Sequence, residues 1–586
     1  MKLVRFERFL LLLFVFVWPP SARSQSGPGA GGAGAAGGPG YRAVEPLLEG
    51  QTIAGVAVVV QPDDPQLRAR ILDVLPISPG DAWEPVLGDL TRAAIRALPG
   101  VEDVRLEGRD LGGFRRQLVI RVRTEQVEPT PSQRGLLQSG RISDFPGLYR
   151  EDGVFFKVEL SGGFGVYSDA NPWFGRPEAF TLRNPLVEDP SVGAGTGAFA
   201  NWGEAFVQFG LSGVTPLVQD RIYVYGAVTG IGIATVGRDI FRSDTRGSIN
   251  LEQGYGGLLW APEGSSFRFK ISVGRQNFTL NDGFLVSQFG SQWNAGPRPG
   301  VYMSPRTTHD FSILSTVRFE EWSGQVFFLN PNEYEPIESN TQLLGTNLRR
   351  QLSDRVSIDA TVMTVPRSDT TYRVPEGASR GREGLLTFAL HAHLRAPPQV
   401  SGLWLSGSVA HQRHADFAMS AWAGYVESGF IARSTPLTPS LSYRLAHFTG
   451  DDPRTRRFER FDTLYSGGLD HWLQGITINK LLSQANRTTH RIRLNVAPVR
   501  TLNLTLDLYL HLAHQLNNLG GNPALGTLDS HDLGQEAQLT ARWAVSRKVL
   551  VQGIASAAFP GAAVEGATPG PDDPWTTLQL QVFWGF

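Results

Sequence analysis

Six basic residues lie in segments where polar and apolar residues alternate, a pattern that would direct their side chains into a polar interior. Each occupies one of the polar positions of its segment. Arg268 and Lys270, for example, alternate with Phe267 and Phe269. Arginine carries a rigid fork of donors that suits the recognition of carboxylates. Because Arg or Lys facing lipid at the midplane costs about 2–4 kcal/mol, such residues are expected to face water. The six are Arg268, Lys270, Arg318, Arg444, Arg491 and Arg493.

No constellation typical of catalysis accompanies these residues. The 11 histidines are scattered, and a sequence without cysteine excludes the usual structural zinc patterns. His391 and His393 share one strand face, where polar lumen positions are favoured over metal ligands. No spacing nominates a Ser/His/acid group. We therefore expect no metal, no cofactor and no enzymatic activity.

The end of the chain predicts the kind of element that would position the basic side chains. Leu578 and Leu580 alternate with polar residues such as Gln579, and the alternation runs on to Trp584 and Phe586. A strand places successive side chains on opposite faces. Outer-membrane barrel strands show this pattern and carry aromatic residues at the lipid–water boundary, which favours a barrel over the alternative of a soluble β-sandwich. Trp584 and Phe586 are also candidate signals for the outer-membrane assembly machinery.

The N-terminal residues indicate an exported chain. Residues 1–24 combine a basic start, a short apolar core and small residues before Gln25, which is the pattern of a cleaved signal peptide. Residues 25–45 form a Gly/Ala-rich linker. No later stretch is long and apolar enough for a transmembrane helix. The net charge of −1 provides no overall positive field, so a nucleic-acid partner is not expected.

Residues 46–126 predict a small α+β domain. A strand, two helices and two further strands are expected in that order, at 53–60, 67–75, 86–98, 101–106 and 118–123. This order, with Pro79-Gly80-Asp81 between the helices and Pro99-Gly100 after them, resembles a POTRA domain. The resemblance implies a periplasmic domain that binds client polypeptides by strand addition at a sheet edge. A small α+β domain of another kind is the alternative.

The remaining chain predicts a mainly β protein, a transmembrane antiparallel β-barrel. Residues 127–150 are a polar connector, and residues 151–586 contain sixteen to eighteen alternating segments, of which eighteen is preferred. Arg275 has the parity of the apolar Val273, so a bulge or the strand end must intervene there. Long loops are expected at 232–246, 277–308, 365–382, 450–475 and 515–530.

Several ordered motifs of the barrel region resemble the alginate-export porin family. They are Gly450-Asp451-Asp452 at a strand end, Phe458 to Asp470 in the following loop, the strand around Gly534-Gln535-Glu536, and Phe559-Pro560-Gly561 before the last strand. The resemblance implies a monomeric eighteen-stranded barrel whose lumen passes a polar or anionic saccharide or small solute. A POTRA-like domain is a departure from that family, so the substrate does not carry over.

The resemblance also implies a role for the basic residues. The six strand residues named above would line the pore, and the loop after Gly450 would place further charges near it: Asp451, Asp452, Arg454, Arg456, Arg457 and Arg460. The alternative for each arginine is a solvated loop charge or a paired charge on the wall.

Three functions are compatible with these features of the sequence. The first is an outer-membrane channel, with the POTRA-like domain in the periplasm docking a protein partner. The second is a POTRA-containing barrel that translocates or assembles proteins. Proteins of that class carry an Arg-Gly-aromatic motif, and the nearest stretch in this sequence, Arg380-Gly381-Arg382, lacks the aromatic residue. The third is an outer-membrane enzyme, for which the sequence nominates no catalytic group.

Overall fold

The computed structural model describes Val44–Glu45 and most of the chain from Ile53 to Gly585. The described part has gaps at 62, 76, 78–82, 84, 97, 99, 111–115, 125–134, 137–146, 152–153, 190–191, 193–198, 219–220, 263–264, 288–297, 306–308, 354, 375–376, 397–401, 433–434, 467–471, 500 and 547. The expected signal peptide and nearly all of the linker lie outside the described residues, as does Phe586. Among the described residues no helix is both long and apolar enough to cross a membrane.

The N-terminal domain is a four-stranded sheet with two helices. Its elements are β1 (Val44–Glu45), β2 (Ile53–Gln61), α2 (Pro65–Val74), α3 (Pro85–Arg96), β3 (Asp103–Asp110) and β4 (Arg116–Arg123). Asp64 begins α2 because its carboxylate accepts the free backbone N–H groups of Gln66 and Leu67, at 2.9 and 3.0 Å. The sheet order is β1-β3-β4-β2, with β2 parallel to β4 and β3 antiparallel to it.

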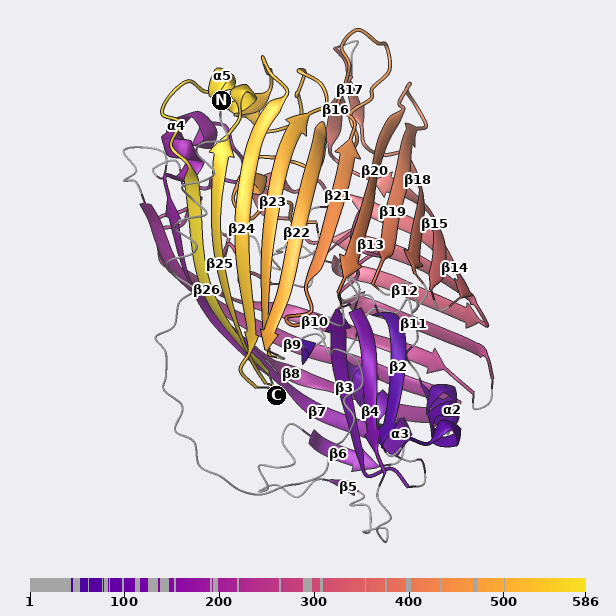
Figure 1. The fold of residues 1–586 in the computed structure, drawn as a ribbon. Coiled ribbons are helices and arrows are strands. Elements are labelled where there is room, and N and C mark those ends of the chain that lie inside the picture. The colour runs from indigo at the N-terminus through magenta and orange to yellow at the C-terminus, as the bar shows by residue number, and fades with distance from the viewer. Residues whose placement is uncertain are drawn as a thin grey trace, which may run out of the picture. The chain divides into compact units, whose positions relative to one another are not determined.

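The main body is a closed antiparallel barrel of eighteen strands, which confirms the predicted fold (Figure 1). The last strand pairs with the first from Thr576 opposite Ala170 to Gly585 opposite Ser161. The strands are β7 (Val154–Ala170), β8 (Phe199–Val218), β9 (Ile222–Gly237), β10 (Arg246–Trp260), β11 (Phe267–Arg275), β12 (His309–Phe319), β13 (Trp322–Pro331), β14 (Gln342–Ser353), β15 (Val356–Arg367), β18 (Leu385–Arg395), β19 (Trp404–His414), β20 (Ala421–Ile431), β21 (Ser440–Phe448), β22 (Arg487–Val499), β23 (Leu502–Ala513), β24 (Asp532–Ala544), β25 (Val549–Pro560) and β26 (Trp575–Gly585).

The two faces of the wall differ in exposure as the alternation predicts. On β26, Leu578 and Leu580 are 58% and 49% exposed on the outside, whereas Gln579 and Gln581 between and beyond them are each 5% exposed. On β7 the same contrast separates the exposed Phe156 from the buried Lys157. The outer face is therefore apolar, as lipid requires, and the inner face is polar.

The longer connections all lie at one end of the barrel. They span 171–198, 276–308, 368–384, 449–486, 514–531 and 561–574, whereas the other end carries mostly short turns. The expected loop at 232–246 is shorter than predicted because β9 continues to Gly237, and the loops at 171–198 and 561–574 were not predicted. The longer connections hold η1 (Pro172–Gly175), α4 (Pro177–Thr181), β16 (Thr371–Arg373), β17 (Ser379–Gly381), η5 (Ile478–Lys480), η6 (Pro523–Leu525) and α5 (Ala562–Ala567). The shorter connection from β13 to β14 holds η3 (Glu335–Ile337). The short β5 (Gly135–Leu136) and β6 (Gly147–Glu151) precede β7.

Candidate functional site: the barrel lumen

An arginine cluster occupies the inner wall on β21 and β22. Arg444 lies directly opposite Arg491 in the strand register, and both side chains are buried. Arg491 forms an ion pair with Glu427 of β20. Arg493 makes a two-pronged contact with Asp507 of β23, its Nε at 2.6 Å and its Nη2 at 2.9 Å from the two carboxylate oxygens. Three of the six predicted basic residues thus gather on adjacent strands.

Arg487 also belongs to the cluster and was not predicted from the sequence. Its Nη1 donates to Asn479 at 3.1 Å and its Nη2 donates to Gln484 at 2.5 Å, so both of these partners are neutral. The available signal was parity, because Arg487, Arg491 and Arg493 are separated by even numbers of residues on one strand.

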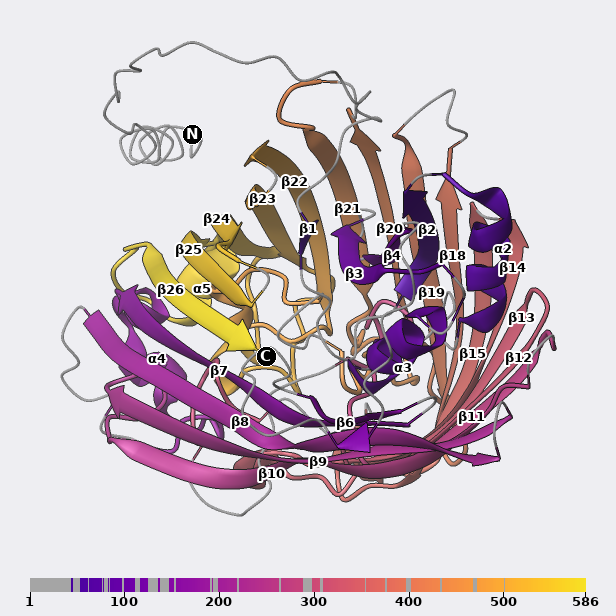
Figure 2. The same ribbon diagram turned by 90° about the horizontal axis from the view of Figure 1, so that it is seen from below.

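The other three predicted residues lie in a different part of the wall. Arg268 and Lys270 are on β11 and Arg318 is on β12, where Arg268 pairs with Arg318 in the register. All three are half-buried. They lie near the end with the short turns and across the ring from β21 and β22 (Figure 2). The structure does not bring the six predicted residues together in one group.

The connection from β11 to β12 enters the barrel and reaches opposite walls. Near its start, Phe284 packs against Tyr425 on the inner face of β20, with ring centroids 5.3 Å apart. Asn281 accepts a hydrogen bond from Arg349 of β14 at 3.2 Å. Near its end, Tyr302 donates its backbone N–H to Glu204 of β8. Because β8 and β20 lie on opposite sides of the ring, this connection crosses the lumen (Figure 2).

The connection from β21 to β22 is the second to fold inward. Asp462 is held to β19 by two hydrogen bonds with Gln412, at 2.8 and 2.9 Å. Tyr465 forms a parallel bridge with Val286 of the first inward connection. Trp472 packs on Tyr425 with centroids 4.8 Å apart. The two inward connections therefore contact each other inside the barrel and narrow it.

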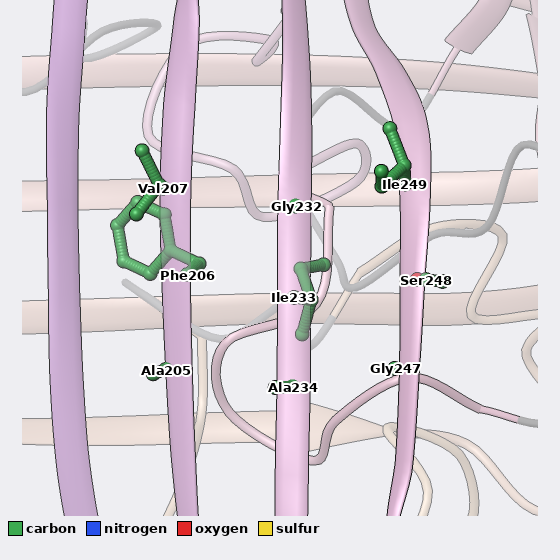
Figure 3. A pocket seen from close by; sticks show the side chains of 9 residues that line it. All are labelled: Ala205, Phe206, Val207, Gly232, Ile233, Ala234, Gly247, Ser248 and Ile249. Atoms are coloured by element: carbon green, nitrogen blue, oxygen red, sulfur yellow. The ribbon is translucent and has the colours of Figure 1, made fainter.

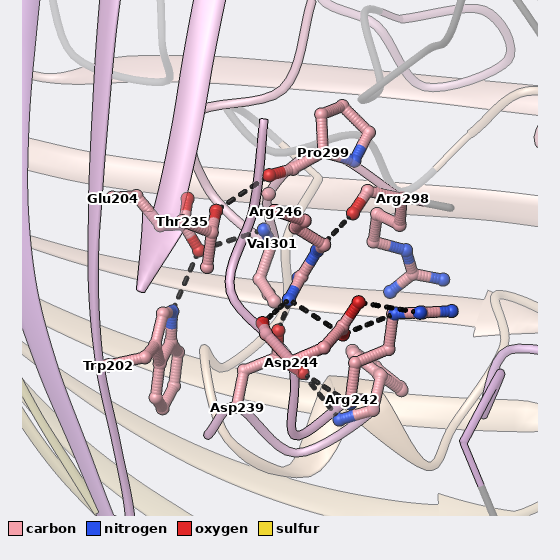
Figure 4. A network of polar contacts seen from close by, with 12 residues as sticks. Trp202, Glu204, Thr235, Asp239, Arg242, Asp244, Arg246, Arg298, Pro299 and Val301 are labelled. Carbon is pink, nitrogen blue, oxygen red and sulfur yellow. Dashed lines mark hydrogen bonds and ion pairs between the residues drawn. The ribbon is translucent and has the colours of Figure 1, made fainter. Parts of the chain in front are cut away.

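A polar network fixes the end of the first inward connection to the wall (Figure 4). The carboxylate of Glu204 receives the Trp202 indole N–H at 2.7 Å and the backbone N–H of Val301 at 2.8 Å. The Thr235 hydroxyl donates to the carbonyl of Pro299 at 2.6 Å. Arg246 donates to the carbonyl of Arg298 and forms an ion pair with Asp239 at 2.5 Å. Three neighbouring strands thus hold residues 298–301.

The Gly450-Asp451-Asp452 motif builds a turn. Asp451 accepts the backbone N–H of Glu459 at 2.9 Å, and burial raises the pKa of its carboxyl. Asp452 binds the Arg454 side chain at 2.7 and 2.9 Å, and these hydrogen bonds lower the pKa of its carboxyl to about 2. Both carboxylates are therefore occupied in shaping the loop.

The basic residues of this loop divide by exposure. Arg454, Arg456 and Arg457 are exposed. Arg460 is buried and donates to Asn518 at 2.9 Å, and burial lowers the pKa of its guanidinium to about 10. The structure thus separates one buried arginine from three solvated ones.

Trp584 packs at the closing seam. Its ring covers Gly162 of β7, where any Cβ would collide with the indole. His391 and His393 lie on the inner face of β18, and both are buried. No group of three His, Cys, Asp or Glu residues that could hold a metal occurs within the described ranges.

A shallow recess lies on the outer face of β8, β9 and β10 (Figure 3). The exposed Val207 and Ile249 flank Gly232, and the lining is otherwise mostly small and apolar. Such a surface suits contact with lipid and offers no group for solute recognition.

Comparisons with known proteins find a matching family model and similar solved structures. A family model described as alginate export matches residues 259–572. Among solved structures, OccK5 (OpdH) of Pseudomonas aeruginosa aligns with a TM-score of 0.43 and 9% identity over 74% of this chain and 98% of that chain. OccAB1 of Acinetobacter baumannii aligns with a TM-score of 0.44 and 10% identity over 74% of this chain and 96% of that chain. A search of curated proteins gives no match.

Proposed function

Since this chain belongs to the alginate export family, we propose that it is an outer-membrane channel whose lumen passes polar or anionic solutes, including an exported acidic polysaccharide. The closed wall supports this function because it satisfies the strand hydrogen bonds within the membrane and encloses a polar interior. A channel needs no partner to complete its wall, which favours a monomer.

The arginine cluster is the observation that carries the proposed selectivity. Four guanidinium groups, those of Arg444, Arg487, Arg491 and Arg493, lie on adjacent strands together with two carboxylates. The carboxylates are Glu427 and Asp507. The difference between four positive and two negative charges leaves an excess of two positive charges. Fixed positive charge on a pore wall favours anions, and arginine binds carboxylates with two parallel hydrogen bonds.

Planar-bilayer recordings test this function. We expect a steady open conductance that prefers anions in a salt gradient and that falls on addition of a polyuronate but not of a neutral polysaccharide. The variant Arg444→Gln/Arg487→Gln should lose anion preference. The pair variant Glu427→Gln/Arg491→Gln removes one charge of each sign and is the matched control. A wild-type protein that gives no conductance contradicts the channel, and one that prefers cations contradicts the role of the cluster.

The N-terminal domain is proposed to lie in the periplasm and to dock a protein partner there. The barrel begins at Val154 on the end with the short turns, which is the periplasmic end in outer-membrane barrels. β2 forms one edge of the domain's sheet, and an edge strand can pair with an added strand. Deletion of residues 46–126 should preserve conductance and abolish capture of the partner. Loss of secreted or outer-membrane client proteins in a deletion strain would instead favour the alternative function in protein translocation or assembly.

A further inference from the structure

Glu536 is a wall carboxylate that holds the second inward connection. It lies on the inner face of β24, is 1% exposed, and accepts the backbone N–H groups of Thr477 at 3.1 Å and Ile478 at 2.8 Å. The Ser556 hydroxyl donates to the same carboxylate at 2.6 Å. The Thr477 hydroxyl extends the contact by donating to Thr577 of β26 at 2.9 Å. Residues 477 and 478 are thereby fixed to three successive strands.

Glu204 holds the first inward connection in the same way. It is 2% exposed on the inner face of β8. Its carboxylate accepts three successive backbone N–H groups, those of Val301 at 2.8 Å, Tyr302 at 2.9 Å and Met303 at 2.7 Å. Successive backbone N–H groups that point at one anion form a concave anion-binding nest. Here the anion belongs to the barrel wall.

A glycine precedes the bound N–H groups in both connections. A Cβ on Gly475 would collide with the carboxylate of Glu536, and Gly475 also adopts a φ of +91°. A Cβ on Gly300 would lie 2.9 Å from Glu204 Oε2. Both backbones can therefore approach their carboxylates only because these positions lack a side chain.

The two held segments meet beside the seam of the barrel. Lys480, just after the segment held by Glu536, lies 5.9 Å from the ring of Tyr302, which belongs to the segment held by Glu204. The same ammonium forms an ion pair with the buried Asp169 of β7 at 2.7 Å. Tyr302 in turn stacks on Tyr167 of β7 with centroids 5.0 Å apart. Residues 300–303 and 475–480 thus lie beside each other on this side of the lumen.

We propose that Glu204 and Glu536 are positioning residues that keep residues 300–303 and 475–478 inside the lumen and so determine the aperture of the channel. The proposal rests on the proposed channel function. A carboxylate suits the task because both of its oxygens accept hydrogen bonds, whereas an amide would present its own N–H₂ group to the backbone donors. Glutamine is nearly isosteric, so Glu→Gln changes the attachment with little change in packing.

Single-channel recording of Glu536→Gln and Glu204→Gln tests the proposal. Each variant should show a larger and less steady open conductance than the wild type, because the released segment leaves the lumen intermittently. The control is Glu159→Gln, which alters a wall carboxylate of β7 that contacts Lys157 and Ser212 of the wall. Its conductance should equal that of the wild type.

A disulfide provides a rescue that a purely structural role would not predict. The native sequence has no cysteine, and the hydroxyls of Thr477 and Thr577 are in contact, so Thr477→Cys/Thr577→Cys can join the segment to β26. Oxidation of this pair within Glu536→Gln should restore the wild-type conductance, and reduction should remove the rescue.

The outcomes separate the two proposals. If the wild type conducts and both Glu→Gln variants match it, the positioning role is wrong while the channel stands. If the wild type does not conduct, the channel itself is wrong. If Glu536→Gln does not fold, Thr477→Cys/Thr577→Cys in the wild-type background is the deciding variant. Its oxidised form should keep the wild-type conductance, because Thr477 already lies against Thr577 of β26 in the wild type. An altered conductance overturns the proposal.

Discussion

The guanidinium of Arg444 lies over the indole of Trp472, with its central carbon 4.2 Å from the ring centroid. This contact joins the wall cluster to the second inward connection. A cation held over the face of an aromatic ring is attracted by the ring quadrupole, more strongly where water is excluded. Trp472 therefore covers Arg444 of the cluster and also packs against Phe284 of the first inward connection.

Trp472→Ala should uncover the cluster. Removal of a buried tryptophan side chain costs about 3–5 kcal/mol of stability, and the exposed guanidinium groups should bind a polyuronate more tightly. The measurements are the unfolding midpoint in denaturant and the polyuronate concentration that halves the conductance. Trp472→Phe keeps a ring over Arg444, so its unfolding midpoint and its half-blocking polyuronate concentration should both stay closer to those of the wild type. A half-blocking concentration that rises in Trp472→Ala would contradict the covering role.

Asp507→Asn should separate stability from selectivity. Asp507 is 1% exposed, accepts both contacts from the half-buried Arg493 and lies 3.9 Å from the buried Arg491, so its neutralisation leaves both guanidinium groups without this carboxylate. Breaking a buried ion pair by removing one partner costs about 3–5 kcal/mol. Denaturant unfolding should show this loss, and reversal potentials should show stronger anion preference. The double variant Arg493→Gln/Asp507→Asn should recover most of the stability; if it is no more stable than Asp507→Asn, the pair is not the cause.

Gly450→Ala should disturb the turn at the base of the second inward connection. A Cβ at this position would collide with the side-chain carbonyl of Asn486. That carbonyl accepts the backbone N–H of Gln515 at 2.7 Å, so it cannot move without losing a bond. Overpacking of this kind costs about 1–3 kcal/mol. Thermal unfolding should show this loss of stability. The double variant Gly450→Ala/Asn486→Ala should lose less stability than the sum of the losses in the two single variants.

The wall could be predicted from the sequence because its signal is local. A period of two fixes the face of every strand residue, and Leu578 and Gln579 lie on the faces expected of them. The exception at Arg275 was also predicted. Val273 is exposed while Arg275 is 2% exposed, because Gly274 adopts a φ of +130° that re-aims the chain at the strand end.

The contents of the lumen could not be predicted because their contacts join distant parts of the chain. Glu204 binds N–H groups almost one hundred residues later, and nothing in the alternation of β8 marks it as an attachment point. Glu536 belongs to a recognised motif, yet its partners are backbone groups of Thr477 and Ile478, whose sequence carries no period. Parity identified the inward residues, whereas the loop backbone decides which of them are occupied by contacts with the loops.

The adjacent carboxyls of Asp451 and Asp452 should respond to pH in opposite directions. Burial raises the pKa of Asp451, so its protonated form is favoured in the folded protein. Its contribution to stability is therefore complete at low pH and is lost as pH rises through the raised pKa. Hydrogen bonds from Arg454 lower the pKa of Asp452 to about 2. Its contribution is present above the unfolded pKa, about 3.9, and is lost as pH falls toward 2.

Isosteric amides distinguish these two effects. The quantity to measure for each variant is the difference in unfolding temperature between variant and wild type as a function of pH. For Asp451→Asn this difference should rise from acid to neutral pH, because the amide avoids a buried charge while its oxygen still accepts the Glu459 N–H. The unfolding temperature of Asp452→Asn should lie slightly below the wild type above pH 4 and meet it as pH approaches 2, since the contact with Arg454 is exposed. If the two difference curves run in the same direction, the opposite environments assigned to these neighbours are wrong. If they diverge, both carboxylates of the Gly-Asp-Asp motif act by shaping their loop.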